Sequence, residues 1–224
     1  MPSIGDIAVE VRRNLGVSEE RLTDAQILNA HNIYAKEIVK GRELWFTTQK
    51  VEQLVTAGRY RISYPPGFRY AVKALLWVNS EPIGAPIELL VATIGEAKRV
   101  GAPTDGECTL LICDEEGFQL QDVPTVDVYI RITCQTFPEE LTGKERTNYL
   151  TDEAPALLTH FLCYKCAPGC AGLMGEAQWH EGEYYKALAA LEDEHTMRIL
   201  SDVEVTGRTD GRRAGYARER GLRL

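Results

Sequence analysis

Three cysteines in the last third of the chain, Cys163, Cys166 and Cys170, are spaced so that they could bind a metal ion. Thiolates are preferred ligands of zinc, and His160 or His180 could complete a set of four. A structural zinc site at a helix turn is therefore one hypothesis. The chain has no second cysteine pair at zinc-finger spacing, however. The other interpretation is that Cys163 and Cys166 pack as small residues on a helix and Cys170 lies in the loop that follows.

Two pairs of acidic residues could perform general acid–base chemistry of the kind that glycosidases use: Glu181 with Glu183, and Glu192 with Glu194. Residues two positions apart on a helix point to different sides, so neither pair is expected to converge on one substrate. We predict that both pairs belong to the solvated face of a long helix. A carboxylate-dependent hydrolase stays as an alternative.

Common catalytic motifs are missing from the sequence. It contains neither a Gly-x-Ser-x-Gly elbow nor a His-Glu-x-x-His pair. His31, His160 and His195 fall beside apolar positions of predicted helices, where a structural role is the simpler explanation. We therefore predict that the protein is not an enzyme and that it holds no cofactor.

Charge is distributed unevenly along the 224 residues. The whole chain carries −8, whereas residues 207–224 hold six arginines and two acidic residues and so carry +4, which leaves −12 on the first 206 residues. An acidic body disfavours nucleic-acid binding, while a basic tail can bind an acidic partner. A small nucleic-acid-binding regulator that uses this tail is a further alternative, and it would bind DNA in a salt-dependent manner.

The composition is that of a folded globular protein, with 44% apolar and 26% charged residues. No apolar stretch approaches the 18 residues of a membrane span, so no membrane association is expected. The first residues lack the basic start and apolar run of a signal peptide. We therefore expect folding in a reducing cytoplasm, with the six cysteines as free thiols.

Helices are predicted at both ends of the chain. Ser3 can cap a helix over 3–15, and a capping-box pattern at Thr23 and Gln26 starts a second helix over 23–40. After Pro138 the helical period returns, with a helix from Thr151 or Asp152 to Cys166 and a long helix over 173–200. Residues from 202 onward are predicted to form an extended arm.

Between these helices the sequence alternates between apolar and polar residues and is cut by glycine and proline, which is typical of strands. A hairpin is predicted where Ala57-Gly58 separates 51–55 from 60–64. Further elements are predicted at 71–78, 93–100 (a short helix), 108–113, 117–120 and 126–133. The predicted fold class is α+β: a four-helix bundle from the N- and C-terminal helices, with an inserted antiparallel β domain (a sandwich or barrel) and an extended C-terminal arm. The predicted boundaries are 1–43 and 139–201 for the bundle, 44–138 for the β insertion and 202–224 for the basic arm.

Several segments, in order, resemble the head-to-tail adaptor proteins of bacteriophages. They are Ile4–Leu15, Leu22–Leu28, Tyr60–Arg69, Val128–Ile132, Phe137–Thr142, Asn148–Thr151 and Leu157-Leu158. The resemblance covers most of residues 3–200, and it rests on the order and spacing of these segments. Pro155 and the cysteine-rich turn at 163–170 depart from the family pattern, and the arginine tail has no position-by-position match.

The resemblance implies a structural virion protein at the head–tail interface, made in the cytoplasm of the host bacterium. Its copies would form a ring, commonly of twelve, that attaches to the portal protein, extends the DNA channel and docks the tail or nozzle. An acidic wall would let DNA pass without specific binding. A tail completion protein of the same virion is the alternative. We expect the arm to contact the portal through Arg208, Arg212, Arg213, Tyr216, Arg218, Arg220, Leu222, Arg223 and Leu224.

Overall fold

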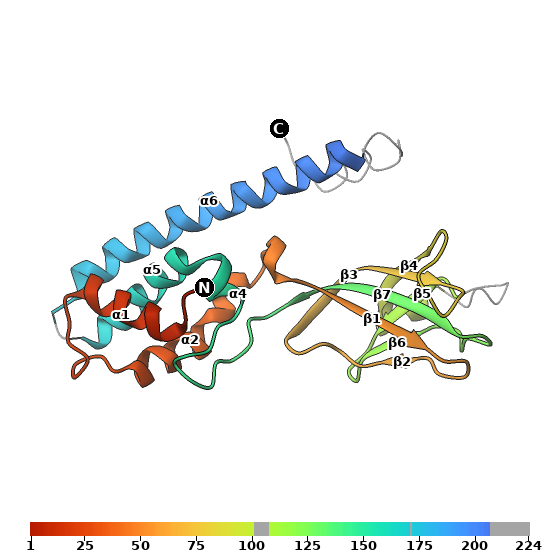
Figure 1. Cartoon of the computed structure of the whole chain (residues 1–224), viewed down its shortest axis with the longest axis horizontal. Helices are drawn as coiled ribbons and strands as arrows, with labels where there is room; N and C mark the ends of the chain where they lie inside the picture. Colours follow the sequence, from red (N-terminus) through yellow and green to blue (C-terminus); the bar gives the residue numbers. More distant parts are fainter. Residues whose placement is uncertain (101–107, 171, 207–224) are drawn as a thin grey trace.

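The computed structural model describes residues 1–100, 108–170 and 172–206. A helical half and a β half lie end to end along the long axis of the molecule, and the last helix crosses above them (Figure 1). Within the described residues, no helix combines the length and the apolar character that a membrane span requires.

The two N-terminal helices confirm the predictions made from their caps. In α1 (Ile4–Leu15), Ser3 and Asp6 form a capping box, and in α2 (Asp24–Val39) Thr23 and Gln26 form another. Each box satisfies backbone N–H groups that the first helical turn leaves unpaired. An ion pair of 2.6 Å between Arg12 and Asp24 then joins the end of the first helix to the start of the second.

The C-terminal helices differ from the prediction in their limits. Asn148 caps α4 (Tyr149–Glu153). The helical conformation is interrupted at Ala154, and α5 (Pro155–Cys166) then begins with a proline in its first turn. The short helix η2 (Ala167–Gly169) follows. The last helix, α6 (Met174–Thr206), has 33 residues and is about 50 Å long. Residues 202–206 are therefore helical, and the prediction that the arm begins at 202 is wrong.

The helix α5 is the centre of the helical half, because it packs against α1, α2 and α6. Its buried residues occupy most of its circumference, and Ala156, His160 and Tyr164 lie on the remaining, partly exposed face. The buried residues are Leu157, Leu158, Thr159, Phe161, Leu162, Cys163 and Cys166. The helical half is thus arranged around one central helix.

A buried polar network joins α2 to the segment that enters the helical half from the sheet. The ring of His31, which is 1% exposed, lies 3.1 Å from the amide oxygen of Asn32 and 3.3 Å from the amide nitrogen of Asn148. Asn32 also bonds both the N–H and the C=O of Leu141, at 2.9 Å each. These partners satisfy polar groups that would be costly to bury alone.

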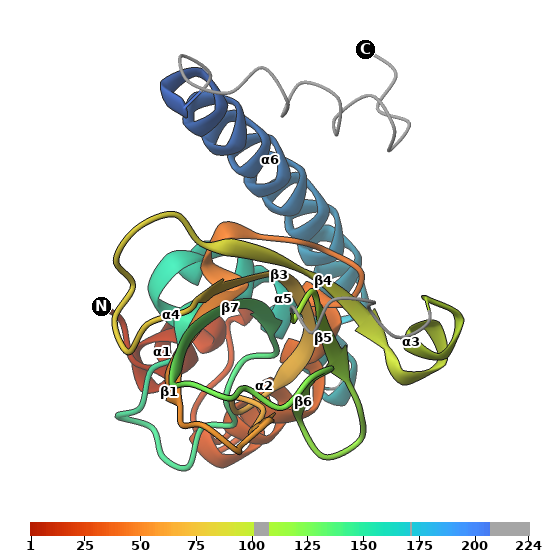
Figure 2. The ribbon, with the colours of Figure 1, turned by 90° about the vertical axis from the view of Figure 1, so that its right-hand side faces the viewer.

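The β half is one seven-stranded sheet in the order β1-β7-β3-β4-β5-β6-β2, and it curls into a nearly closed barrel (Figure 2). The strands are β1 (Thr48–Val55), β2 (Arg61–Ile62), β3 (Phe68–Trp77), β4 (Ile87–Thr93), β5 (Leu110–Cys113), β6 (Phe118–Leu120) and β7 (Val128–Thr136). β4 and β5 are parallel, and the other neighbours are antiparallel. A parallel pair needs a crossover connection, and here that connection contains α3 (Ile94–Val100).

The predicted fold class is therefore wrong. The described residues form six α-helices and a mixed seven-stranded sheet, not a four-helix bundle with a small antiparallel insertion. The hairpin predicted at Ala57-Gly58 does not form, because β1 pairs along its whole length with β7 and β2 pairs with β6. Alternation of apolar and polar residues reveals the buried face of a strand, but it does not specify the partner strand.

The interior of the barrel is closed by aromatic rings and by close backbone contacts. Tyr64 and Phe68 stack with their ring centroids 4.0 Å apart, and Phe118 meets both rings edge-on. Gly117 lies so near the carbonyl oxygen of Ile62 that an added Cβ would be 2.5 Å from it. Glycine is thus required where β2 approaches β6.

Candidate functional site

The C-terminal half of α6 is fastened to the segment between the helical and β halves. Arg42 pairs with Glu192 at 2.8 Å. The ring of His195 stacks on Trp45, the first residue of η1 (Trp45–Thr47), and the guanidinium carbon of Arg198 lies 4.1 Å from the centroid of the same indole. Burial lowers the pKa of His195. These contacts hold the helix in the position seen in Figure 1.

Large apolar side chains are exposed at several positions along α6. Trp179, Tyr185, Met197 and Ile199 are between 49% and 66% exposed. Aromatic residues and methionine are enriched in the contact surfaces of protein complexes. These exposed residues of α6 can therefore contribute to a surface that binds another chain.

A second apolar surface lies at the tip of the β half. β3 starts beside the helical half, where Phe68 pairs with Thr136, and runs outward to Trp77. Beyond that end is a hollow of about 280 Å³. Its apolar lining consists of Leu76, Val78, Ile87, Val123, Pro124, Val126 and Val128. One carboxylate oxygen of Asp122, which also lines it, is buried without a hydrogen-bond partner in the described part.

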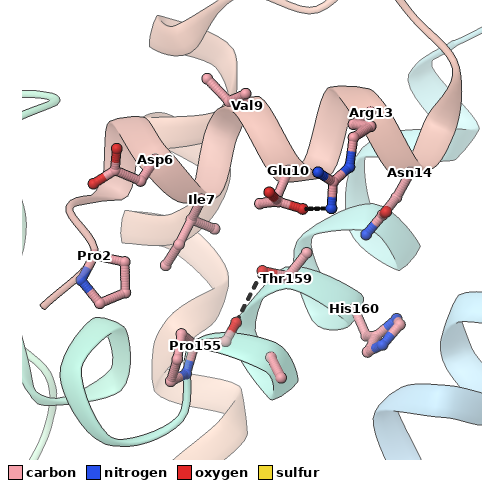
Figure 3. Close-up of a pocket in the computed structure, with 11 residues that line it drawn as sticks. Pro2, Asp6, Ile7, Val9, Glu10, Arg13, Asn14, Pro155, Thr159 and His160 are labelled. Atoms are coloured by element: carbon pink, nitrogen blue, oxygen red, sulfur yellow. Dashed lines mark hydrogen bonds and ion pairs between the residues drawn. The ribbon is translucent and has the colours of Figure 1, made fainter.

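An open groove of about 650 Å³ separates α1 from α5 (Figure 3). The charged groups along it are already paired: Arg13 pairs with Glu10, and Asp6 accepts a 2.9 Å hydrogen bond from the hydroxyl of Ser3. Thr159 donates a 2.9 Å hydrogen bond to the carbonyl of Pro155. His160 lines one end of the groove. The groove offers little unpaired charge to a substrate.

Behind that end of the groove two histidines meet. Nδ1 of His160 on α5 lies 3.0 Å from Nδ1 of His180 on α6, and His180 is only 1% exposed. Burial, and then the charge of His160, lower the pKa of His180. The sequence indicated either residue as a partner for the cysteines, but it did not indicate that the two would face each other, because 20 residues separate them.

The cysteines behave as packing residues. All six are free thiols. Burial raises the pKa of Cys163 to about 12 and that of Cys166 to about 11, so both are thiols at neutral pH. The Sγ of Cys163 points to the carbonyl of Val11, 3.8 Å away. Across residues 1–100, 108–170 and 172–206, no three histidine, cysteine or acidic side chains gather as a metal-binding group. The hypothetical set of cysteine and histidine ligands does not converge.

The acidic pairs considered for catalysis do not form a joint site. Glu192 is bound to Arg42, and Glu194 to Arg198 at 2.7 Å. Glu183 is bound to Lys186, also at 2.7 Å. Each of these carboxylates is thus paired with a basic side chain: Arg42, Arg198 or Lys186.

The portal-contacting residues predicted at 208–224 lie outside the described residues. No protein-family model matches this chain, and no curated protein is significantly similar to it.

Proposed function

We propose that this protein is a bacteriophage head-to-tail adaptor, which binds the portal as a ring, extends the DNA channel and docks the tail or nozzle. The last helix, α6, is the feature that supports this proposal most directly. This helix of 33 residues is anchored beside Trp45, exposes aromatic and aliphatic side chains, and leads directly into the segment 207–224 with its net charge of +4. Such a helix can present the basic segment to a partner outside the subunit.

The separation of the exposed apolar surfaces supports the same function. A closed ring needs two different, complementary surfaces on each subunit, because each copy contacts its two neighbours in a head-to-tail manner. Here one apolar surface follows α6, and another surrounds the hollow at the tip of the β half. The −12 carried by residues 1–206 further suits a channel wall along which DNA slides, since like charges repel the phosphates.

The test is the mass of the complex that forms with the portal protein of the same virus, measured by mass photometry. Twelve copies of the 25.0 kDa chain would add about 300 kDa to the portal ring. We expect a single added step in mass, with portal alone and adaptor alone as references. An unchanged portal mass would contradict the proposal. Binding to isolated tails in place of the portal would instead support a tail completion protein.

A further inference from the structure

The imidazoles of His160 on α5 and His180 on α6 meet head-on. Their Nδ1 atoms are 3.0 Å apart, which is a hydrogen-bond distance, and the ring centroids are 5.3 Å apart. Two imidazoles in such a contact cannot lie much further apart, so both nitrogens fall close to the line that joins the ring centres. A contact of this shape holds one proton between the nitrogens, which one ring donates and the other accepts.

The second ring nitrogen of His180 decides which ring donates. The main-chain carbonyl of Asn14, near the end of α1, accepts a hydrogen bond from His180. Since Nδ1 faces His160, Nε2 is the nitrogen that donates to this carbonyl. A neutral imidazole has one N–H and one lone pair, so Nδ1 of His180 accepts and Nδ1 of His160 donates. One directed chain of hydrogen bonds therefore joins α5, α6 and α1 through His180, which is 1% exposed.

The number of ring nitrogens limits the charge that the pair can carry. The neutral pair has two N–H groups, one between the rings and one donated to Asn14. A first added proton fits on Nε2 of His160, outside the contact, and leaves the bond between the rings in place. A second would set two N–H groups against each other across 3.0 Å, and the bond would be lost. Burial, which lowers the pKa of His180, acts in the same direction.

Two carboxylates of α6 favour a positive charge on the pair. Glu176 and Glu183 stand about one helical turn before and after His180, and their charges oppose the effect of burial on its pKa. The charge of Glu183 also interacts with His160. Glu183 is already bound to Lys186 at 2.7 Å, which neutralises much of its charge. The carboxylates of α6 are therefore better matched to one positive charge on the pair than to two.

The other elements around the pair add little net charge. On α1, Glu10 and Arg13 line the groove beside His160 and pair with each other (Figure 3), and Asp6 lines the same groove. The short helix η2, which packs against α5 and α6, has no titratable side chain. Among the described residues, none from α2 lines this groove or the hollow beside His180. Since His160 stands at the end of the groove, protons can reach the pair from solvent.

We propose that His160 and His180 form a pH-sensitive junction, which takes up one proton with the helices in place and releases the N-terminal half of α6 from α5 and α1 when it takes up a second. The sign follows from His180. Because burial lowers its pKa below the ordinary 6.5, its contribution to stability is complete above about pH 6.5. This contribution is lost as the pH falls through the lower pKa of the folded protein. The junction is independent of the adaptor proposal, because it rests on contacts within one subunit.

Nitrogen NMR of the full chain, labelled at histidine and made without a histidine tag, tests the hydrogen bond. The chain has four histidines, and the variants His160→Gln and His195→Gln assign their signals. At about pH 8 we expect the Nδ1–H tautomer for His160, the Nε2–H tautomer for His180 and a scalar coupling between the two Nδ1 nuclei. The coupling should persist through the first protonation and disappear with the second. Absence of the coupling at about pH 8, or an Nε2–H tautomer in both rings, would overturn the proposal.

Hydrogen exchange tests the release of α6. Between about pH 8 and about pH 5, after correction for intrinsic exchange, protection of the amides at 177–188 should fall at least about tenfold, with β7 as the internal reference. In His160→Gln the fall should be much smaller, because the glutamine amide can donate to a neutral His180 or accept from a charged one. His195→Gln is the matched control, since it removes another histidine of α6 and should retain the fall. Unchanged protection in the unaltered protein, or an equal fall in His160→Gln, would show that the pair does not control α6.

Discussion

The imidazole of His195 stacks on the indole of Trp45, with ring centroids 6.4 Å apart and planes inclined by 19°. One residue belongs to the last helix and the other to the start of η1, which leads into the sheet. This contact, with the Arg42–Glu192 ion pair beside it, fixes the exposed C-terminal half of α6 relative to the rest of the protein. Its loss should free that part of the helix without unfolding the core.

Trp45→Ala should therefore increase hydrogen exchange in residues 190–199. The substitution removes the stacking with His195 and the contact with Arg198, and the loss of such aromatic contacts costs about 1 kcal/mol beyond the buried area. Met197→Ala, at an exposed position of the same helix, is the control and should leave exchange unchanged. Equal exchange in Trp45→Ala and the parent protein would show that other contacts hold α6.

Stability should decrease as the pH falls below about 6.5. Burial lowers the pKa of His31 from its ordinary 6.5, so the folded protein keeps this ring neutral while the unfolded chain takes up a proton. The stabilisation from the neutral His31 ring is complete above the pKa that this ring has in the unfolded chain. It is lost as the pH falls toward the lower pKa of the folded protein. Denaturation midpoints in urea at pH 7.5 and 5.5 measure the effect. His31→Gln should reduce the difference between the two midpoints. An unchanged difference would mean that other groups cause the pH dependence.

Gly117→Ala should disrupt the pairing of β2 with β6. A Cβ there would lie 2.5 Å from the carbonyl oxygen of Ile62, so the backbone must move, and a cost of about 2–3 kcal/mol is expected. Gly143→Ala is the control because nothing lies within 4 Å of its Cβ position. Thermal unfolding followed by circular dichroism should show a clear fall in Tm for the first variant alone. Equal Tm values would mean that the sheet adapts at this point.

Removal of residues 207–224 should abolish portal binding and leave the subunit folded. The deletion takes away a net charge of +4, whereas the two cores are built from residues before 207. Calorimetry should give the Tm of the full chain, and mass photometry should detect no complex. Portal binding by the shortened protein would assign the contact to α6 or to the β tip.

The helix starts could be predicted because their signals are local. Ser3 with Asp6 and Thr23 with Gln26 satisfy the first turns of α1 and α2 within four residues. The end of α6 was placed too early because the sequence from about residue 202 onward has few apolar residues and four glycines, whereas the helix continues to Thr206. The cap at Asn148 is equally local, because its side chain accepts hydrogen bonds from the N–H groups of Leu150 and Thr151, and the prediction that the helix starts at Thr151 or Asp152 overlooked it.

By itself, the sequence determined the helices at both ends, the strand-rich middle, the free thiols and the separation of an acidic body from a basic tail. Only the tertiary structure decided that β1 pairs with β7, that β4 and β5 are parallel, and that His160 meets His180. Helix caps, turn residues and charge act over a few neighbouring positions, so the order of residues reveals them. Strand partners and facing side chains depend on which buried surfaces fit together, and that fit is established only when distant parts of the chain pack against each other.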